Sequence, residues 1–341
     1  MKNSARDAFL GALVADAIAM PVHWYYNQEL LQRDYGLIDR YHAPQNPHAD
    51  SILWRSSYQA LNEKGDILRE QAAYWGQRGI HYHQFLKSGE NTLNQLLAIE
   101  LVEMIREEGT YDPAHWLSRY IAFMLTPGRH HDTYVEEYHR HFFASYAAGK
   151  KPLLCGGPDV HIGGLAAVPA LVASLGATNP DLLEIVQTHV ALTHKDDGVL
   201  AAADVLARLL VRLASGDDLQ RAILEEAPDW ISAAKIRQWE KQPDRSVVGE
   251  ILSSACYIPD AFPASLFLAY RHAGNFAAGV CANAQVGGDN CHRGTVVGSL
   301  LGASAEIPAR FVDGLVAGAK VSQRLGAAKS SEDSASGSAP I

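Results

Sequence analysis

The chain has few cysteines, no block of like charge and no long apolar run. Its 341 residues include four cysteines, which lie far apart and form no CxxC pair. Neither a disulfide scaffold nor a zinc ribbon is therefore indicated, and we expect a cytoplasmic protein with reduced thiols. The net charge is −9 and the lysines and arginines are scattered, which argues against nucleic acid or an anionic membrane surface as a partner.

Two further scarcities bear on the fold class. No apolar run reaches the roughly 18 residues of a membrane-spanning helix, and strand-like alternation of polar and apolar residues is rare. Apolar residues instead recur at helical spacing, for example over residues 96–105 and 199–213. The sequence therefore predicts an all-α protein and leaves its oligomeric state open.

Small residues spaced four apart form a stripe near each end of the chain. The members are Gly11, Ala15 and Ala19 near the N-terminus and Gly294, Gly298 and Gly302 near the C-terminus. Such stripes let two helix backbones approach closely, so we expect both ends of the chain in one core and a single domain over residues 1–321. Residues 322–341 are low in complexity and predict a flexible tail.

Two long segments, 35–90 and 126–164, lose the helical spacing and are rich in aromatic and histidine residues. Irregular connections of this length inside a compact domain are usually functional or disordered. Their aromatic content argues against disorder. We therefore expect both segments to contribute to a site.

The most informative motif runs from Gly287 to His292 and precedes a run of small and apolar residues. Asp289, Asn290, Cys291 and His292 place four ligand types within one turn, at the start of a predicted helix. Polar groups beside a core need partners once water leaves, so the cluster indicates a site. The alternative interpretation is an ordinary helix cap by Asp289 or Asn290.

The N-terminal apolar segment carries one carboxylate, Asp16, and ends at Pro21. A buried carboxylate there needs hydrogen bonds or a cation, and a purely structural aspartate is an equal alternative. An imidazole and three aromatic rings follow over His23–Tyr26. They suit stacking on a flat ring, although aromatic residues at a helix end are more often core.

Two shorter motifs stand before predicted helices. Residues 88–92 read Ser-Gly-Glu-Asn-Thr, and Thr193–His194 leads the apolar stretch after it. The free N–H groups and the macrodipole at a helix start favour anions. Capping is the competing interpretation of the first motif, and a structural histidine that of the second.

Taken in order, these motifs resemble the ADP-ribosylglycohydrolase family over nearly the whole chain. The family's opening GAxxGDAxGxPxE pattern resembles Gly11–His23, and its Leu-Thr-His segment matches Leu192–His194. Its metal motifs fall on Gly89–Thr92 and Gly287–His292. The resemblance implies a single compact orthogonal helical domain with a binuclear magnesium centre, which hydrolyses N- or O-glycosidic bonds of ADP-ribose. For such a substrate we expect the helix starts at Leu93 and Thr295 to hold the anionic diphosphate.

The metal motifs depart from the family pattern. Glu90 and Asn91 replace two aspartates, and Cys291 and His292 stand where the family has aspartate and threonine. Magnesium prefers oxygen ligands, so we expect at most one divalent cation, with zinc as a minor alternative. The altered motifs also resemble those of the J1-crystallin branch of the family.

We therefore predict a glycohydrolase-like hydrolase with an altered metal centre, acting on an ADP-ribosyl or related ribosyl bond of a small molecule or a modified protein. The alternative is a non-catalytic nucleotide-binding or crystallin-like structural protein. The candidate catalytic residues are Asp289, Glu90 and Asp16. The candidate substrate-binding residues are His23, Trp24, Tyr25, Gly163, Gly164, His194, Gly287 and Gly288. The family's metal positions fall on Glu90, Asn91, Thr92, Asp289, Cys291 and His292.

Overall fold

The computed structural model describes residues 4–326, and this part of the chain is helical without a β-strand. The predicted all-α class is confirmed. Short bridges such as His161 with Tyr257 tie loops together instead of forming a sheet.

The α-helices are α1 (Ser4–Ala19), α2 (Gln28–Tyr35), α3 (Leu93–Glu108), α4 (Pro113–Leu125), α5 (Glu137–Ala147), α6 (Val168–Leu175), α7 (Leu182–Ala191), α8 (Asp197–Ala214), α9 (Leu219–Glu226), α10 (Ala233–Trp239), α11 (Asp244–Val247), α12 (Ile258–Arg271), α13 (Phe276–Gln285), α14 (Asn290–Ser304), α15 (Ala309–Gly314) and α16 (Gly318–Gly326). The 3-10 turns are η1 (Met20–Val22), η2 (Leu53–Arg55), η3 (Glu63–Gly65), η4 (Arg69–Tyr74), η5 (Pro152–Leu154) and η6 (Ile162–Leu165).

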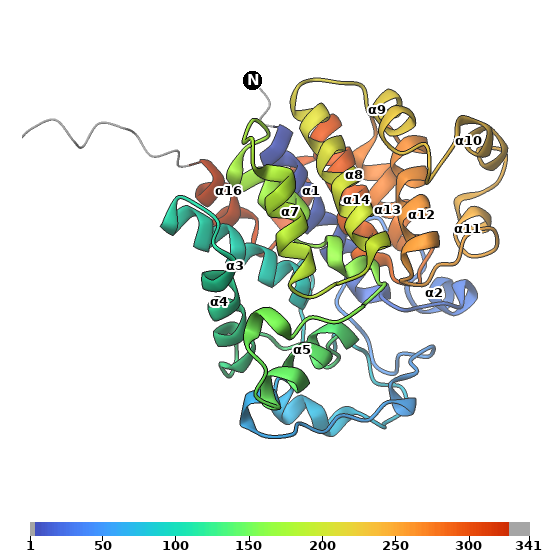
Figure 1. The fold of residues 1–341 in the computed structure, drawn as a ribbon. Coiled ribbons are helices and arrows are strands. Elements are labelled where there is room, and N and C mark those ends of the chain that lie inside the picture. Colours follow the sequence, from blue (N-terminus) through green and yellow to red (C-terminus); the bar gives the residue numbers. More distant parts are fainter. Residues whose placement is uncertain (1–3, 327–341) are drawn as a thin grey trace, which may run out of the picture.

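Helices α1 and α14 lie side by side at the centre of the molecule (Figure 1). Both are apolar or small on nearly every face, as expected of helices that are surrounded by protein. A Cβ added at Gly11 would lie 2.1 Å from the carbonyl oxygen of Gly298, and one at Gly302 would lie 2.4 Å from that of Asp7. The predicted close approach of the two terminal helices is confirmed.

The remaining helices cover this central pair. Helices α6, α8, α12 and α13 pack against α1 or α14, and their apolar faces complete the core. Helices α4 and α5 and the aromatic-rich segment after α2 lie at one end of the molecule (Figure 1). That segment buries Trp75 and Tyr82. None of the helices in residues 4–326 is long and apolar enough to cross a membrane.

The C-terminal boundary lies slightly beyond the predicted one. Helix α16 continues to Gly326, so the first five residues of the predicted tail are helical. Residues 327–341 of that tail lie outside the described residues.

Replacing Gly298 with alanine tests the packing of α1 against α14. The new methyl group would lie 2.2 Å from the carbonyl oxygen of Gly11 and 2.6 Å from the Ala15 Cβ, so the helices must separate. We expect Gly298→Ala to lower the free energy of unfolding by about 1–3 kcal/mol, measured by urea denaturation. Gly198→Ala in α8 is the control, because its nearest neighbours are side-chain atoms at 3.1 and 3.5 Å. Equal stability of the two variants would contradict this packing.

The buried histidines make stability depend on pH. His189 in α7 lies outside the sequence motifs, so a change there tests this dependence without altering them. Burial lowers the pKa of His189 to about 3, whereas the unfolded chain binds its proton below pH 6.5. The free energy of unfolding therefore decreases as the pH falls from 6.5 towards 3. At pH 5 the decrease that is due to His189 is ~2 kcal/mol. His189→Asn keeps a partner for the Tyr111 hydroxyl at 3.1 Å and should reduce the loss between pH 7 and 5. The variant His115→Asn, at a side chain that is 39% exposed, should leave the slope unaltered, and equal slopes for both variants would refute the assignment.

Candidate functional site

The start of α14 is held against the exit of α1 by backbone contacts. Gly287 and Gly288 have φ values of +67° and +68°, which glycine adopts without strain. A Cβ at Gly287 would lie 2.2 Å from the Tyr25 carbonyl oxygen, and the Gly288 N–H donates to the same oxygen at 2.6 Å. The glycine pair therefore approaches the protein's own backbone. Neither glycine is among the described residues that line the cleft, so their predicted contact with substrate gains no geometric support.

Arg293, which the sequence reasoning missed, braces the same turn. Its side chain is fully buried, and its guanidinium donates to the carbonyl oxygen of Gly287 at 2.6 Å and to Asn283 Oδ1 at 2.8 Å. Burial lowers the pKa of Arg293 to about 10, so the group stays charged at neutral pH. It joins the end of α13 to the start of α14.

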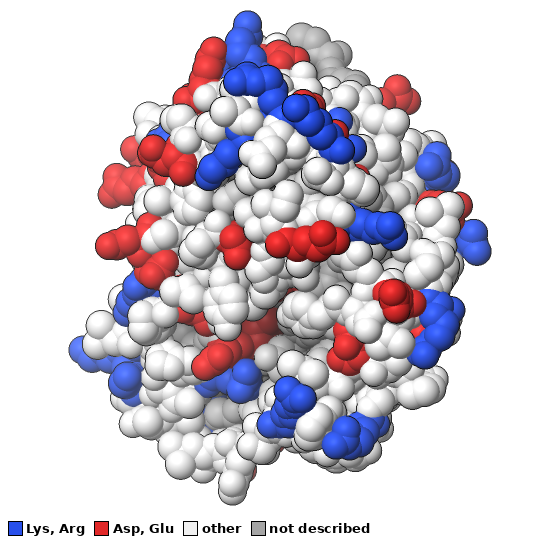
Figure 2. All heavy atoms as spheres, turned by 90° about the vertical axis from the view of Figure 1, so that its right-hand side faces the viewer, with Lys and Arg blue, Asp and Glu red and all other residues white. Residues whose placement is uncertain are grey.

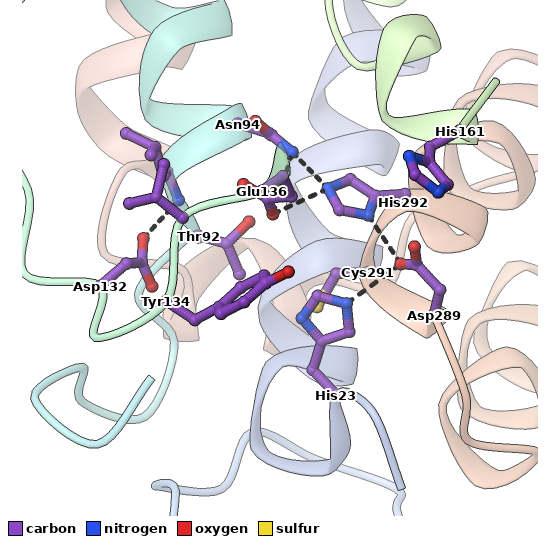
Figure 3. Close-up of polar contacts among 12 residues, drawn as sticks. His23, Thr92, Asn94, Asp132, Tyr134, Glu136, His161, Asp289, Cys291 and His292 are labelled. Atoms are coloured by element: carbon purple, nitrogen blue, oxygen red, sulfur yellow. Dashed lines mark hydrogen bonds and ion pairs between the residues drawn. The ribbon is translucent and has the colours of Figure 1, made fainter. Parts of the chain in front are cut away.

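Asp289 occupies the N-cap position of α14, but its side chain makes no capping bond. Its Oδ1 atom instead contacts His292 Nδ1 at 2.6 Å and His23 Nε2 at 3.0 Å (Figure 3). Burial by itself raises the pKa of Asp289, but the two imidazoles outweigh it and hold the pKa well below its usual range. The buried carboxylate is thus ionised, and the simple cap interpretation does not describe its side chain.

His292 lies between two carboxylates. Its Nδ1 faces Asp289, and its Nε2 lies 3.3 Å from Glu136 Oε1 and contacts the Asn94 amide (Figure 3). Burial lowers the pKa of His292, but the carboxylates raise it well above its usual value. Burial likewise opposes ionisation of Glu136, yet His292 lowers its pKa to about 2. The three groups form a carboxylate, imidazolium and carboxylate in line.

A chain of buried polar groups continues on the other side of Asp289. His23 Nδ1 lies 2.7 Å from His83 Nε2. His83 Nδ1 contacts Asp132, whose Oδ2 accepts the Leu93 N–H at 2.7 Å. Burial lowers the pKa of His23 to about 3, although the contact with Asp289 raises it, so this imidazole is neutral at pH 7.

Two sets of donor atoms could hold a metal ion: His23, Asp289 and His292, and His23, His83 and Cys291. The atoms of each set lie within 4.8 Å of one another. Asp289 is the only carboxylate among them, whereas two magnesium ions need several carboxylates to offset their repulsion. The described residues therefore do not fit a binuclear magnesium centre. Nitrogen and sulfur donors of this kind suit zinc better.

Asp16 fastens the 88–92 loop to α1. Its Oδ2 accepts the Asn91 side-chain N–H and the Thr92 backbone N–H, each at 2.9 Å, and its Oδ1 accepts the Thr92 hydroxyl at 2.7 Å. Burial raises the pKa of Asp16, and these donors lower it only in part. Asp16, Asn91 and Thr92 do not line the cleft, so the structural interpretation of Asp16 fits the geometry. Cys291 is fully buried nearby, with Sγ 3.6 Å from the Asp16 carbonyl oxygen.

Glu90 does not join this group, which corrects the expectation that it converges with Asp289. Its Oε2 accepts the Lys87 backbone N–H at 2.8 Å and so closes its own turn. The preceding Gly89 packs tightly on Gly314, where a Cβ would lie 2.2 Å from the carbonyl oxygen. This contact sets the direction of the loop, and Glu90 lines a separate cavity with Glu70 and His131.

A cleft of about 260 Å³ opens above Asp289 and His292, which is room for a small-molecule ligand. Figure 2 shows a face of the molecule that is hollowed near its middle, with acidic atoms in the recess. The remaining lining groups are mainly aromatic and acidic: Trp24, Tyr26, Tyr82, Tyr134, Tyr138, Tyr257, Glu136, Glu137, His161 and Gly163, with Ile52, Leu53, Ser56 and Cys256.

The predicted aromatic residues divide between cleft and core. Trp24 lines the cleft at a φ of +62°, and its ring stacks on His23 with a centroid distance of 3.7 Å. His23 itself is fully buried beneath it. Tyr25 turns into the core, where its ring stacks on His48 and its hydroxyl donates to Asp34 at 3.0 Å. The predicted substrate contact of Tyr25 is therefore corrected, because backbone bonds at the glycine pair fix its direction.

A second, smaller cavity of about 50 Å³ shares Tyr138 and Gly163 with the first. Gly164 and His194 line this inner cavity. A Cβ at Gly164 would lie 2.9 Å from His194 Cγ, so the glycine makes room for the imidazole. Burial lowers the pKa of His194 to about 4, which leaves it neutral.

Neither predicted anion site at a helix start is free. The Leu93 N–H already donates to Asp132. Thr295 lies inside α14, which begins at Asn290, and it accepts a bond from Gln95. The expectation that these two positions hold a diphosphate is therefore wrong.

Five groups of the site were not singled out from the sequence: His83, Asn94, Asp132, Tyr134 and Glu136. Three of them belong to the 126–164 segment, where acidic residues stand within the run from His130 to His141. Carboxylates inside a histidine-rich connection were the available signal. His83 belongs to the other irregular segment, 35–90.

Comparison with known proteins adds a family and a fold. A family model described as ADP-ribosylglycohydrolase matches residues 1–335. A solved structure titled "ADP-ribosylglycohydrolase-related protein complex" is similar in fold, with a TM-score of 0.63, 22% sequence identity and 95% of each chain covered. No curated protein matches the chain.

The donor set predicts how the protein responds to magnesium. Titration of the purified protein should show no pair of magnesium sites by calorimetry, because Asp289 is the single carboxylate in the candidate groups. The double variant Asn91→Asp with Cys291→Asp places two carboxylates beside Asp16. It should lose thermal stability in EDTA and regain it with magnesium, since the added cation relieves their repulsion. Two tightly bound magnesium ions in the unmodified protein would overturn this assignment.

Proposed function

The chain belongs to the ADP-ribosylglycohydrolase family, and we propose that it hydrolyses a glycosidic bond of an ADP-ribosyl or related ribosyl compound bound in the cleft over Asp289. The family indicates a glycohydrolase-type hydrolase. The observation that carries the proposal is the ionised Asp289 carboxylate, held in place by two imidazoles beside an aromatic cleft.

Asp289 has the geometry of a general base. Both imidazoles contact Oδ1, which leaves Oδ2 to receive a proton from a water molecule. His23 and His292 fix the orientation of the carboxylate, so little reorganisation is needed when the water attacks the anomeric carbon. Its low pKa limits its strength as a base. This suits a reaction in which the glycosidic bond is largely broken before the water attacks.

The buried chain behind Asp289 holds this carboxylate in place and does not relay its proton. His23 donates from Nε2 to Asp289 Oδ1 at 3.0 Å, so this nitrogen cannot also take up the proton that Oδ2 accepts. The proton on Oδ2 returns to solvent through the cleft, which Asp289 lines. Asp132 holds the far end of the chain at the start of α3.

The cleft walls would bind the ribosyl compound. Trp24 presents a ring that is already fixed by His23 and by edge contacts with Tyr82 and Tyr134. Stacking on such a ring contributes about 1–3 kcal/mol in nucleotide sites. At most one divalent cation would bind, at His23, Asp289 and His292, and no step proposed here depends on it. A modified protein side chain or a small nucleotide-like molecule would occupy the open side.

Asp289→Asn tests the role of the carboxylate. Turnover is measured with ADP-ribosylated arginine, ADP-ribosylated serine and small ribosyl compounds. For whichever of them the protein hydrolyses, kcat should fall by about 100-fold or more, since the amide accepts no proton. Asp229→Asn, at an exposed position, is the matched control and should keep full activity. Unchanged turnover in Asp289→Asn would refute the assignment, and no turnover of any compound by the unmodified protein would favour the non-catalytic alternative.

A further inference from the structure

The charge of the cleft does not suit a diphosphate. Glu136, Glu137 and Asp289 line it, and no lysine or arginine is found among its described lining residues. The charge of His292 is already shared by Asp289 and Glu136. His161 is paired with Asp159 at 2.8 Å. The three carboxylates outnumber the one charged imidazole among these lining groups, so an anionic ligand would meet an excess of negative charge.

Backbone donors near the cleft are also engaged. The Leu93 and Thr92 N–H groups at the start of α3 donate to Asp132 and Asp16. At the starts of η6 and α12, the Ile162 and Ile258 N–H groups donate to backbone carbonyls at 2.8 and 3.1 Å. These four N–H groups are therefore not free to bind a phosphate.

The same cleft offers several features that attract a cation. Six aromatic rings line it, and ring faces attract positive charge. Glu136 Oε2 is buried without a hydrogen-bond partner in the described structure; the nearest ion-pair contact is His139 Nε2 at 3.8 Å. A carboxylate oxygen left in this state gains most from a positively charged ligand.

Two arginines near the cleft do not line it: Arg293 is fully buried at the start of α14, and Arg140 stands behind the aromatic wall. Arg140 donates to the Tyr134 hydroxyl at 3.4 Å and to the Val135 carbonyl oxygen at 3.1 Å. Its guanidinium lies 5.2 Å from the centroid of the Trp75 ring. It does not line the cleft.

We propose that the cleft binds a cationic ribosyl compound without phosphate, of the N-ribosylpyridinium class. This inference rests on the proposed function and names its substrate class. In hydrolysis the C1′–N bond breaks and its electron pair neutralises the ring nitrogen, while the water oxygen bonds to C1′ and a water proton passes to Asp289. The leaving base departs neutral, so no general acid is required.

Binding by calorimetry at low ionic strength tests the proposal independently of turnover. The probes are nicotinamide riboside, its 5′-phosphate, adenosine and ADP-ribose, measured with the inactive Asp289→Asn variant and, for the two adenine compounds, also with the unmodified protein. Affinity should fall at least about tenfold from the riboside to its 5′-phosphate, and ADP-ribose should bind more weakly than adenosine. Glu137→Gln should weaken riboside binding about threefold and leave adenosine unchanged. The exposed Glu240→Gln variant is the control.

The outcomes separate this inference from the proposed function. Tighter binding of the 5′-phosphate or of ADP-ribose, or no binding of the riboside, overturns the inference while hydrolysis of ADP-ribosyl compounds would still support the function. Tighter binding of ADP-ribosylated arginine than of the riboside overturns it as well. If the affinities follow the predicted order but the unmodified protein hydrolyses none of the compounds, the inference is supported and the proposed function is refuted.

Discussion

The contact between α1 and α14 positions the rest of the site. His23 follows the end of α1, and Asp289 immediately precedes α14. The two helices can approach closely only because glycines face each other at Gly11 and Gly298. Bonds between the Tyr25 and Gly288 backbones then fix the separation of the two side chains. A small shift between these helices would break the 3.0 Å contact of His23 with Asp289.

The second constraint is electrostatic. Buried carboxylates are stable only when paired, and here the partners alternate along one chain from Asp132 through His83 and His23 to Asp289, and then through His292 to Glu136. The imidazoles thus supply, inside the protein, the compensation that these carboxylates need. This arrangement explains why the altered motif residues can be buried together without disrupting the core.

The cleft combines this fixed charge with a fixed aromatic wall. Trp24, Tyr82 and Tyr134 meet edge to face, an arrangement that keeps the rings in place. The inner cavity continues behind Tyr138 towards His194. Recognition would therefore depend on ring stacking and on the sign of the ligand's charge more than on direct bonds from basic side chains.

The sequence by itself determined the all-α class, the union of both chain ends in one core and the importance of Asp289 and His292. These follow from local periodicity, from small-residue spacing and from polar groups that need partners. It did not predict where the Glu90 and Tyr25 side chains point or that the Leu93 N–H is already bonded. The direction of a side chain in a loop depends on contacts with distant backbone, such as Gly89 with Gly314. Only the tertiary structure decided that Asp132, His83 and Glu136 complete the site. Their partners lie 39 to 156 residues away, and no local pattern records a contact over such a separation.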